Sequence, residues 1–285
     1  MTSLRVFCAL KDFFCFQGAS AMKFTKMQGL GNDYVYVYSK REPENPEELS
    51  IKLSDRHFGI GSDGMIWILP SNIADFKMRI FNADGSEAMM CGNGIRCVGK
   101  YVYDKGLTKK TKITVETLSG IKTLDLKIEK GKVDSVSVNM GKAVAGLVNR
   151  IDVCGKDVEY IPVSVGNPHA VVFVDDIGQA EITTVGPAME HSDRFPDGVN
   201  VEFVQAISEN KLRMRVWERG SGITMACGTG SCATVMAAIS IGLCRNNADV
   251  AVELDGGTLI INIAEDNTVT MTGPARISFE GEVNI

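Results

Sequence analysis

Two cysteines in this sequence are each followed by glycines in the same spacing. Cys91 opens the tetrapeptide Cys-Gly-Asn-Gly, and Cys227 opens Cys-Gly-Thr-Gly. Each tetrapeptide precedes a segment that we expect to be helical, so each thiol would lie at a helix N-terminus. The unpaired N–H groups and the positive end of the helix dipole lower the pKa of a thiol there. The same N–H groups can bind a carboxylate, and glycine lets a ligand approach the backbone closely.

Two such sites facing each other would place their thiols on opposite sides of one ligand. This arrangement suits inversion at a carbon atom next to a carboxylate. One thiolate removes the proton from one face, and the opposite thiol delivers a proton to the other face. The N–H donors around the carboxylate stabilise the carbanion. The pattern therefore favours two-base proton transfer with Cys91 and Cys227 as the acid and base.

Other uses of the cysteines fit the sequence less well. The sequence has eight cysteines, three histidines and no Cys-x-x-Cys pair, which argues against zinc and against a redox dithiol. The Cys-Gly-Asn-Gly turn lacks a following Lys-Ser/Thr, which argues against a phosphate-binding loop. A structural disulfide between Cys91 and Cys227 stays open, although it would not require both glycine turns. Four further cysteines are expected to be small buried apolar residues: Cys97, Cys154, Cys232 and Cys244.

The chain contains an internal repeat. The two cysteines are 136 residues apart, and residues 78–81 match residues 214–217 at the same offset. Further pairs follow in the same order and near the same offset: 31–32 with 166–167, 115–116 with 252–253, and 140–143 with 272–275. Matches kept in one order at one spacing indicate two homologous halves.

Each half has the same expected order of secondary structure. A strand region comes first, at residues 33–39 and 169–175. In the first half a helix is expected from Pro46 to about His57, because Asn45 and Glu48 are placed as a capping box and proline suits the first helical position. Strands follow at 65–69 and 77–81, and at 201–206 and 212–217. A second helix follows each glycine turn, near 95–105 and 230–243, and alternating strands end each half at 113–116, 123–128 and 133–138, and at 250–254, 258–263 and 268–272.

The fold class follows from the helix at 230–243, which has almost no charged face and should be buried all round. Strands around one apolar helix predict an α+β fold rather than a doubly wound sheet. We expect two homologous halves from an internal duplication, each a mixed, strand-rich, barrel-like sheet around a central apolar helix, with the active site in the cleft between them. The N-terminal half would comprise residues 22–138 joined by 274–285, and the C-terminal half residues 139–273.

The composition is that of an ordinary globular protein and excludes several functions. Of the 285 residues, 45% are hydrophobic and 23% are charged, which is enough for a sizeable core. The net charge of −5 and the lack of a basic run argue against nucleic-acid binding. No stretch of about 20 apolar residues occurs, so no membrane span is expected. Sparse cysteines fit a reduced, cytoplasmic compartment. Residues 1–21 are interpreted as an extension of doubtful structure, too interrupted by charge for a signal peptide.

Five motifs occur in an order typical of one family. They are GLGNDY (29–34), FNADGSEAMMCGNGIRC (81–97), GNPH (166–169), GVN (198–200) and ERGSGITMACGTGSCAT (218–234). Together they resemble the diaminopimelate epimerases, the pyridoxal-independent amino-acid epimerases of lysine and peptidoglycan precursor biosynthesis. The resemblance spans residues 22–285 and does not include residues 1–21.

The resemblance implies roles for residues at matching positions. Cys91 and Cys227 match the acid/base pair, and His169 and Glu218 match positions that tune the pKa of the thiols. A larger set matches residues that bind substrate: Asn32, Asn82, Gly92, Asn93, Asn167, Asn200, Glu218, Arg219, Gly228 and Thr229. Some family members have a ligand-binding glutamine where this chain has Gly64, so that contact is absent here or made by backbone.

The resemblance further implies interconversion of LL- and meso-2,6-diaminopimelate without cofactor or metal, in a cytoplasmic homodimer. The residue types agree with a ligand that is zwitterionic at both ends. An asparagine amide can serve an ammonium and a carboxylate together, and Arg219 can bind a carboxylate through two hydrogen bonds.

Three alternatives remain at this stage. A proline or hydroxyproline racemase also uses paired cysteines, but its substrate has no second amino-acid end. A non-catalytic amino-acid-binding module on the same scaffold would not need two thiols. A thiol–disulfide oxidoreductase would be expected to carry the Cys-x-x-Cys pair that this chain lacks.

Overall fold

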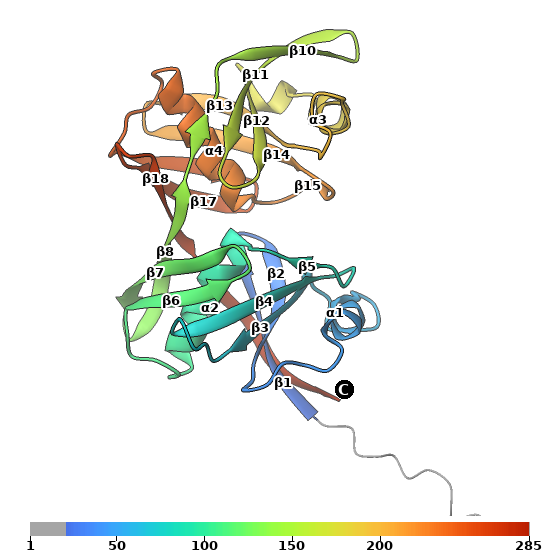
Figure 1. Cartoon of the computed structure of the whole chain (residues 1–285), viewed down its shortest axis with the longest axis vertical. Helices are drawn as coiled ribbons and strands as arrows, with labels where there is room; N and C mark the ends of the chain where they lie inside the picture. Colours follow the sequence, from blue (N-terminus) through green and yellow to red (C-terminus); the bar gives the residue numbers. More distant parts are fainter. Residues whose placement is uncertain (1–20, 285) are drawn as a thin grey trace, which may run out of the picture.

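The computed structural model describes residues 21–284, which form two stacked lobes with one helix inside each (Figure 1). Residues 1–20, which make up nearly all of the expected extension, lie outside the described part. Ala21, the last residue of that expected extension, is the first residue of strand β1.

The first lobe contains the predicted elements in the predicted order, together with two strands that were not predicted, β1 and β5 (Glu87–Ala88). Its central helix is α2 (Gly92–Asp104), and a shorter outer helix, α1 (Pro46–Ser54), covers one face of the strands. The strands are β1 (Ala21–Gly29), β2 (Asn32–Tyr38), β3 (Gly64–Leu69), β4 (Phe76–Asn82), β5 (Glu87–Ala88), β6 (Lys112–Thr117), β7 (Gly120–Glu129) and β8 (Lys132–Lys142).

The second lobe repeats this plan. Its central helix is α4 (Gly228–Ser240), its outer helix is α3 (Ile182–Glu190), and a short 3-10 turn spans Ile177–Gln179. The strands are β9 (Val144–Ala145), β10 (Asn149–Val153), β11 (Lys156–Ser164), β12 (Pro168–Phe173), β13 (Asn200–Ser208), β14 (Lys211–Glu218), β15 (Gly222–Ile223), β16 (Asp249–Leu254), β17 (Gly257–Ile263) and β18 (Thr268–Pro274).

Strand pairing shows that the two lobes are copies of one plan. In the first lobe β2 and β3 run parallel with Tyr34 opposite Gly64, and in the second β12 and β13 run parallel with His169 opposite Asn200. In the first lobe β3 then pairs antiparallel with β4, and β4 pairs parallel with β6. In the second lobe β13 pairs antiparallel with β14, and β14 pairs parallel with β16. The predicted α+β class and the internal duplication are therefore confirmed.

Two pairings join the lobes. The last strand, β19 (Arg276–Asn284), lies antiparallel to β1, so the C-terminus returns to the first lobe (Figure 1). Strand β18 pairs with β8 from Thr268 to Pro274, which makes the sheet continuous across the junction. Strand β8 itself runs through position 138, so the expected boundary between residues 138 and 139 falls inside one strand and stays a prediction.

The two central helices begin against each other. A Cβ atom built on Gly228 would lie 3.5 Å from the Cα of Gly92, so the glycine at each helix start permits this approach. Helix α4 is buried on nearly all sides, as its sequence predicted. One core cluster surrounds both helices, while smaller clusters lie under α1 and α3.

Three local predictions differ from the structure. Helix α1 ends at Ser54 rather than near His57, because the Asp55 carboxylate accepts the N–H groups of His57 and Phe58 and turns the chain. The side chain of Asn45 does not cap this helix, so the predicted capping box is wrong. Helices α2 and α4 begin at Gly92 and Gly228, two to three residues before the predicted starts.

Candidate active site

Both candidate catalytic cysteines are the N-cap residues of the central helices. The Cys91 Sγ accepts a hydrogen bond from the Gly94 N–H at 3.3 Å, and the Cys227 Sγ accepts one from the Gly230 N–H at 3.3 Å. Both residues have extended backbone angles that direct the chain into the helix. The first turns of α2 and α4 abut, so the free N–H groups at the two helix starts lie in one region of the molecule. Helix-start N–H groups can bind an anion, and the predicted carboxylate-binding residues Gly92, Asn93, Gly228 and Thr229 all belong to these first turns.

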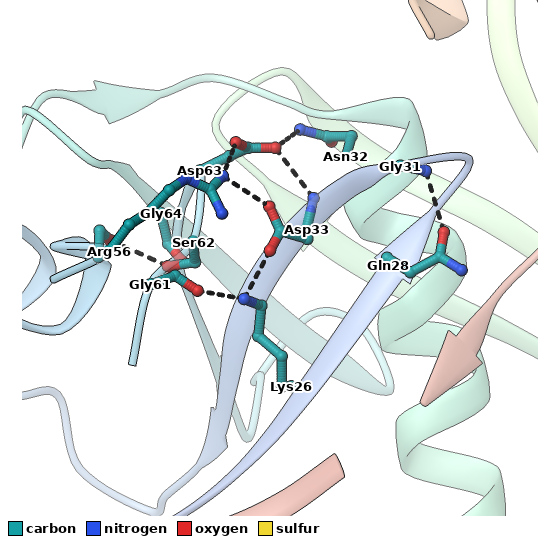
Figure 2. A network of polar contacts seen from close by, with 11 residues as sticks. Lys26, Gln28, Gly31, Asn32, Asp33, Arg56, Gly61, Ser62, Asp63 and Gly64 are labelled. Atoms are coloured by element: carbon teal, nitrogen blue, oxygen red, sulfur yellow. Dashed lines mark hydrogen bonds and ion pairs between the residues drawn. The ribbon is translucent and has the colours of Figure 1, made fainter. Parts of the chain in front are cut away.

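Asn32 contacts the first thiol. The Cys91 Sγ lies 3.3 Å from Asn32 Oδ1, and Asn32 Nδ2 donates to Asp63 Oδ2 at 2.8 Å. The Asp63 carboxylate also accepts the Asp33 N–H and pairs with Arg56 (Figure 2). Asp63 thus sets which end of the Asn32 amide faces the thiol. The sequence prediction did not include Asp63.

Asn82 and Gly64 lie opposite each other on β4 and β3, close to this cluster. The Asn82 side chain donates to Ser86 Oγ at 3.0 Å. A Cβ atom on Gly64 would lie 2.2 Å from the Phe81 carbonyl oxygen and 2.9 Å from the Tyr34 ring. This backbone therefore has no room for a side chain at position 64. The ligand contact that a glutamine makes at this position in some family members cannot be made by a side chain here.

A chain of four side chains leads from a buried carboxylate to the second thiol. Glu202 Oε1 lies 2.7 Å from His169 Nδ1, and His169 Nε2 lies 3.0 Å from Asn167 Oδ1. Asn167 Nδ2 donates to Thr229 Oγ1 at 3.3 Å, and that hydroxyl lies 3.6 Å from the Cys227 Sγ. The structure thus brings together three predicted residues, His169, Asn167 and Thr229.

Glu202 was missed by the sequence prediction. It is fully buried, and among the described residues its Oε2 is the one buried side-chain oxygen or nitrogen without a hydrogen-bond partner. A glutamate inside the apolar run Asn-Val-Glu-Phe-Val was the available signal, because carboxylates are rarely buried without a partner. Its position in the repeat corresponds to Ile66, which is 136 residues earlier.

Glu218 lies beside Cys227 at the end of β14. Thr224 Oγ1 donates to its Oε1, and burial raises the pKa of the carboxyl above its usual range. The position 136 residues earlier is Asn82, so the two halves carry an acid and an amide at equivalent places.

Asn200 and Arg219 lie together beside this region, but their polar groups are engaged within the protein. Asn200 donates to the Pro168 carbonyl oxygen at 2.9 Å and accepts the Arg219 N–H at 3.1 Å. The Arg219 guanidinium donates to the Asp197 carbonyl oxygen at 3.0 Å and remains on the surface. Asn93 is also engaged, since its amide contacts Arg96 and the Ala226 carbonyl oxygen.

The expectation of lowered thiol pKa values is wrong for this structure. Burial raises the pKa of Cys91, and the first-turn N–H groups of α2 offset this only in part. Burial raises the pKa of Cys227 well above its usual range, with the carboxylates of Glu218 and Glu202 adding to the effect. Burial removes water from the sulfur and so disfavours the charged thiolate. This effect raises the pKa more than the N–H groups at the helix N-terminus lower it.

The remaining described cysteines divide into buried and exposed residues. Cys97, Cys232 and Cys244 are buried, and burial raises the pKa of Cys97 to about 11 and of Cys232 to about 12. Cys154 is exposed in the turn between β10 and β11, so its prediction as a buried residue is wrong. A positive φ of 56° places it at the turn itself, where the side chain faces water. All six cysteines in residues 21–284 are free thiols.

No group of three or more His, Cys, Asp and Glu side chains in residues 21–284 is arranged to bind a metal ion. None of the helices in this part of the chain has the length and apolar character needed to cross a bilayer.

Solved structures with the same fold belong to several enzyme families. A probable proline racemase from Agrobacterium radiobacter aligns with a TM-score of 0.71 and 16% identity, covering 92% of each chain. A PhzF-family phenazine biosynthesis protein from Bacillus anthracis aligns with a TM-score of 0.72 and 17% identity, covering 93% of this chain and all of that one. At these identities the likeness shows the fold alone.

Sequence comparison is more specific. The family model for diaminopimelate epimerase matches residues 24–145 and 161–278. A diaminopimelate epimerase from Acetivibrio thermocellus is 51% identical over 279 residues, covering 93% of this chain and 99% of that protein. One from Parabacteroides distasonis is 52% identical over 268 residues, with the same coverage. On this evidence the chain belongs to the diaminopimelate epimerase family.

Proposed function

We propose that this protein interconverts LL- and meso-2,6-diaminopimelate by proton transfer at one α-carbon, with Cys91 and Cys227 as the two bases and no cofactor. The observation that carries the proposal is the pair of N-cap cysteines on helices whose first turns abut. Family membership supplies the substrate.

The proposed proton transfer uses this geometry. The substrate carboxylate binds the N–H groups at the starts of α2 and α4, which places the α-carbon between the thiols. The thiolate of one cysteine takes the α-proton and becomes a thiol, and the thiol of the other gives its proton to the opposite face and becomes a thiolate. The N–H groups stabilise the negative charge that spreads onto the carboxylate between the two steps.

The surrounding polar residues fit supporting roles. The buried Glu202 holds the His169 ring, which holds Asn167 and thereby Thr229 beside Cys227. Asn32 faces Cys91 and lies where it can bind the substrate ammonium or carboxylate. The roles of Asn82, Asn200 and Arg219 as substrate ligands rest on the family resemblance, and Arg219 would have to leave the Asp197 carbonyl to bind a carboxylate.

A proline or hydroxyproline racemase is the nearest alternative, because solved structures of these enzymes share the fold. Their 16% identity contrasts with about 50% to diaminopimelate epimerases. The comparison therefore favours the diaminopimelate substrate.

The test uses the purified full chain in deuterated water with LL-diaminopimelate, meso-diaminopimelate, L-proline and hydroxyproline as separate substrates. We expect inversion of both diaminopimelate isomers with one deuterium entering per inversion, and no inversion of the proline compounds. Inversion of proline with none of diaminopimelate would overturn the assignment. Binding of diaminopimelate without deuterium entry would indicate a non-catalytic binding protein.

We also propose a cytoplasmic homodimer, as the family resemblance implies. The experiment for the assembly is light scattering of the purified chain at several concentrations. A mass of twice the chain's 30.9 kDa is expected, and a constant single-chain mass would contradict it.

A further inference from the structure

A buried arginine lies where the two central helices meet. Arg96 is in α2, and its side chain has no measurable solvent exposure. Within the described chain it forms no ion pair with any carboxylate, although buried charges are normally paired. The equivalent position in the second half is Cys232, so the duplicated site contains one such cation.

The guanidinium is held by neutral groups from both sides of the junction. It donates to the Gly92 carbonyl oxygen at 3.0 Å and to Asn93 Oδ1 at 3.0 Å, both in its own helix. It also donates to the Pro274 carbonyl oxygen at 3.2 Å, where β18 gives way to β19. A Cβ atom on Gly273 would lie 3.1 Å from the guanidinium Nε, so the space is shaped around this group.

Asn93 extends this contact to the second thiol. Its Oδ1 accepts from Arg96, and its Nδ2 donates to the Ala226 carbonyl oxygen at 3.0 Å. Ala226 immediately precedes Cys227, so the amide joins the first turn of α2 to the residue before the cap of α4. The Asn93 side chain is 133 residues away from Ala226 in sequence and is almost fully buried.

We infer that Arg96 and Asn93 are positioning residues that lock the spacing of the two thiols, with Arg96 fixing the Asn93 amide and the amide fixing the loop before Cys227. The inference rests on the proposed two-base function. It gives the Asn93 side chain a role other than the substrate binding predicted from sequence, and leaves only the Asn93 backbone N–H to bind the carboxylate.

The physical argument is that a two-base reaction requires both thiols to be correctly placed at the same moment. A displacement of about 1 Å at a reacting group can lower the rate about 100-fold. The lobes are joined by sheet pairing at β8 and β18, which does not itself fix the loop at Ala226. A planar guanidinium with donors on several edges can hold three acceptors in fixed directions, whereas a lysine ammonium cannot reproduce that geometry.

The experiment compares Asn93→Ala and Arg96→Lys with the control Val102→Ala in the full-length protein. Val102 is fully buried in the same helix, and its truncation should destabilise α2 without touching either cysteine. Four quantities are measured: kcat and KM with each diaminopimelate isomer, deuterium entry without inversion, and amide hydrogen exchange of a peptide covering residues 224–228.

For Asn93→Ala we expect kcat of epimerisation to fall about 100-fold, as a misplaced reacting group predicts, with KM changed less than about threefold. Deuterium entry should fall less than inversion, because exchange at one face needs one thiol. Arg96→Lys should show a smaller loss in the same direction. Both variants, and not Val102→Ala, should speed hydrogen exchange at residues 224–228.

A rise in KM with kcat preserved would show that the Asn93 amide binds substrate, and would overturn the inference. Equal losses of inversion and deuterium entry, or the same kinetic changes in Val102→Ala, would also overturn it. If the unmodified protein does not epimerise diaminopimelate, the proposed function fails. In that case hydrogen exchange at residues 224–228 still decides whether Asn93 fixes the loop.

Discussion

The two halves of the site share a backbone and differ in charge. At both helix starts the thiol accepts a hydrogen bond from the N–H of the glycine three residues later, which is Gly94 in α2 and Gly230 in α4. Each of these glycines packs against a strand residue. In the first half a Cβ on Gly94 would meet the Ile66 side chain at 2.6 Å, and in the second a Cβ on Gly230 would meet Glu202 Oε1 at 2.7 Å. One equivalent position is thus apolar in one copy and a buried carboxylate in the other.

The difference shows which parts of a duplicated site are free to diverge. In the proposed mechanism the N–H groups that bind the carboxylate come from both helices, which agrees with the presence of the Cys-Gly-x-Gly turn in both halves. The side chains around the two thiols can differ more freely. Glu218 adds to burial in raising the pKa of both thiols, but Arg96 lowers the pKa of Cys91, whereas a second carboxylate, Glu202, raises the pKa of Cys227 further.

The largest expected effect comes from removing either thiol. Cys91→Ala and Cys227→Ala should each lower epimerisation by at least about 10²–10⁴-fold, because a positioned acid or base is lost and no other group serves that face. Each variant should still exchange the α-hydrogen of the isomer that faces the surviving thiol. Deuterium entry into LL- and meso-diaminopimelate, followed by mass spectrometry, measures this preference.

The two variants should prefer opposite isomers. Circular dichroism and melting temperature serve as controls for folding. Epimerisation at a near wild-type rate by either variant would rule out the two-thiol mechanism, and a shared isomer preference would rule out thiols on opposite faces.

The next effect concerns the buried carboxylate that distinguishes the second half. Glu202→Gln keeps the shape but removes the charge that holds His169. We expect kcat to fall about 10–100-fold, as for loss of a residue that orients an acid–base group. The matched change in the first half is Ile66→Val, which should destabilise the protein by about 0.5–1.5 kcal/mol and leave kcat nearly unchanged.

Comparable kcat losses in Glu202→Gln and Ile66→Val would mean that both positions act through packing. That result would remove the proposed electrostatic difference between the halves. Melting temperatures measured alongside kcat separate the two explanations.

The repeat and the positions of Cys91 and Cys227 at helix starts could be predicted from the sequence because they depend on local patterns. The Cys-Gly-x-Gly turns and apolar helices recur at a fixed offset, so the helix positions of Cys91 and Cys227 could be read from the chain itself. Alternating residues likewise placed twelve strands within a few residues, but the longer strands β1, β10, β11 and β19 and the short strands β5, β9 and β15 were not predicted.

The remaining features depend on tertiary contacts, and of these only Glu202 had a local signal, as a carboxylate within an apolar strand. Asp63, Glu202 and Arg96 act through partners that are distant in sequence or buried by the fold. The sign of the thiol pKa shift required knowing how much water each sulfur loses, which the helix N-terminus does not reveal. Cys154 was mispredicted because residue type alone cannot show that a cysteine occupies a tight turn.

A chemical difference between the thiols should follow from their surroundings. Both pKa values are raised, so the thiolate fraction and the alkylation rate should increase with rising pH. Cys227 should lag behind Cys91, because Glu202 and Glu218 both oppose ionisation of Cys227, whereas Glu218 opposes that of Cys91 and Arg96 favours it. Short iodoacetamide treatments between about pH 7 and 10, followed by peptide mass spectrometry, measure the alkylation rate of each thiol. If the pKa values of the two thiols differ by one unit, their thiolate fractions differ about tenfold at a pH below both values.

Access to the reagent could also favour Cys91, because Cys227 is the more buried thiol. Glu202→Gln separates the two causes, since it removes a charge and keeps the side-chain volume. The variant should speed alkylation of Cys227 and leave Cys91 unchanged. If the Cys227 rate does not change, burial rather than charge sets the difference.

The smallest expected effect lies at the residue that orients Asn32. Asp63 orients Asn32 as His169 and Glu202 orient Asn167. The Asp63 side chain, however, is 37% exposed, and its ion-pair partner Arg56 also pairs with Asp33. An exposed carboxylate contributes little because water can replace its contacts. Asp63→Asn keeps one oxygen for the Asn32 amide, so we expect a fall of only about threefold in kcat/KM, within the range for a weakened exposed contact. Deuterium entry should fall most for the isomer that faces Cys91. A loss as large as that of Glu202→Gln would mean that Asn32 needs the same rigid support as Asn167, and that the halves differ in residue type but not in how firmly each holds its thiol.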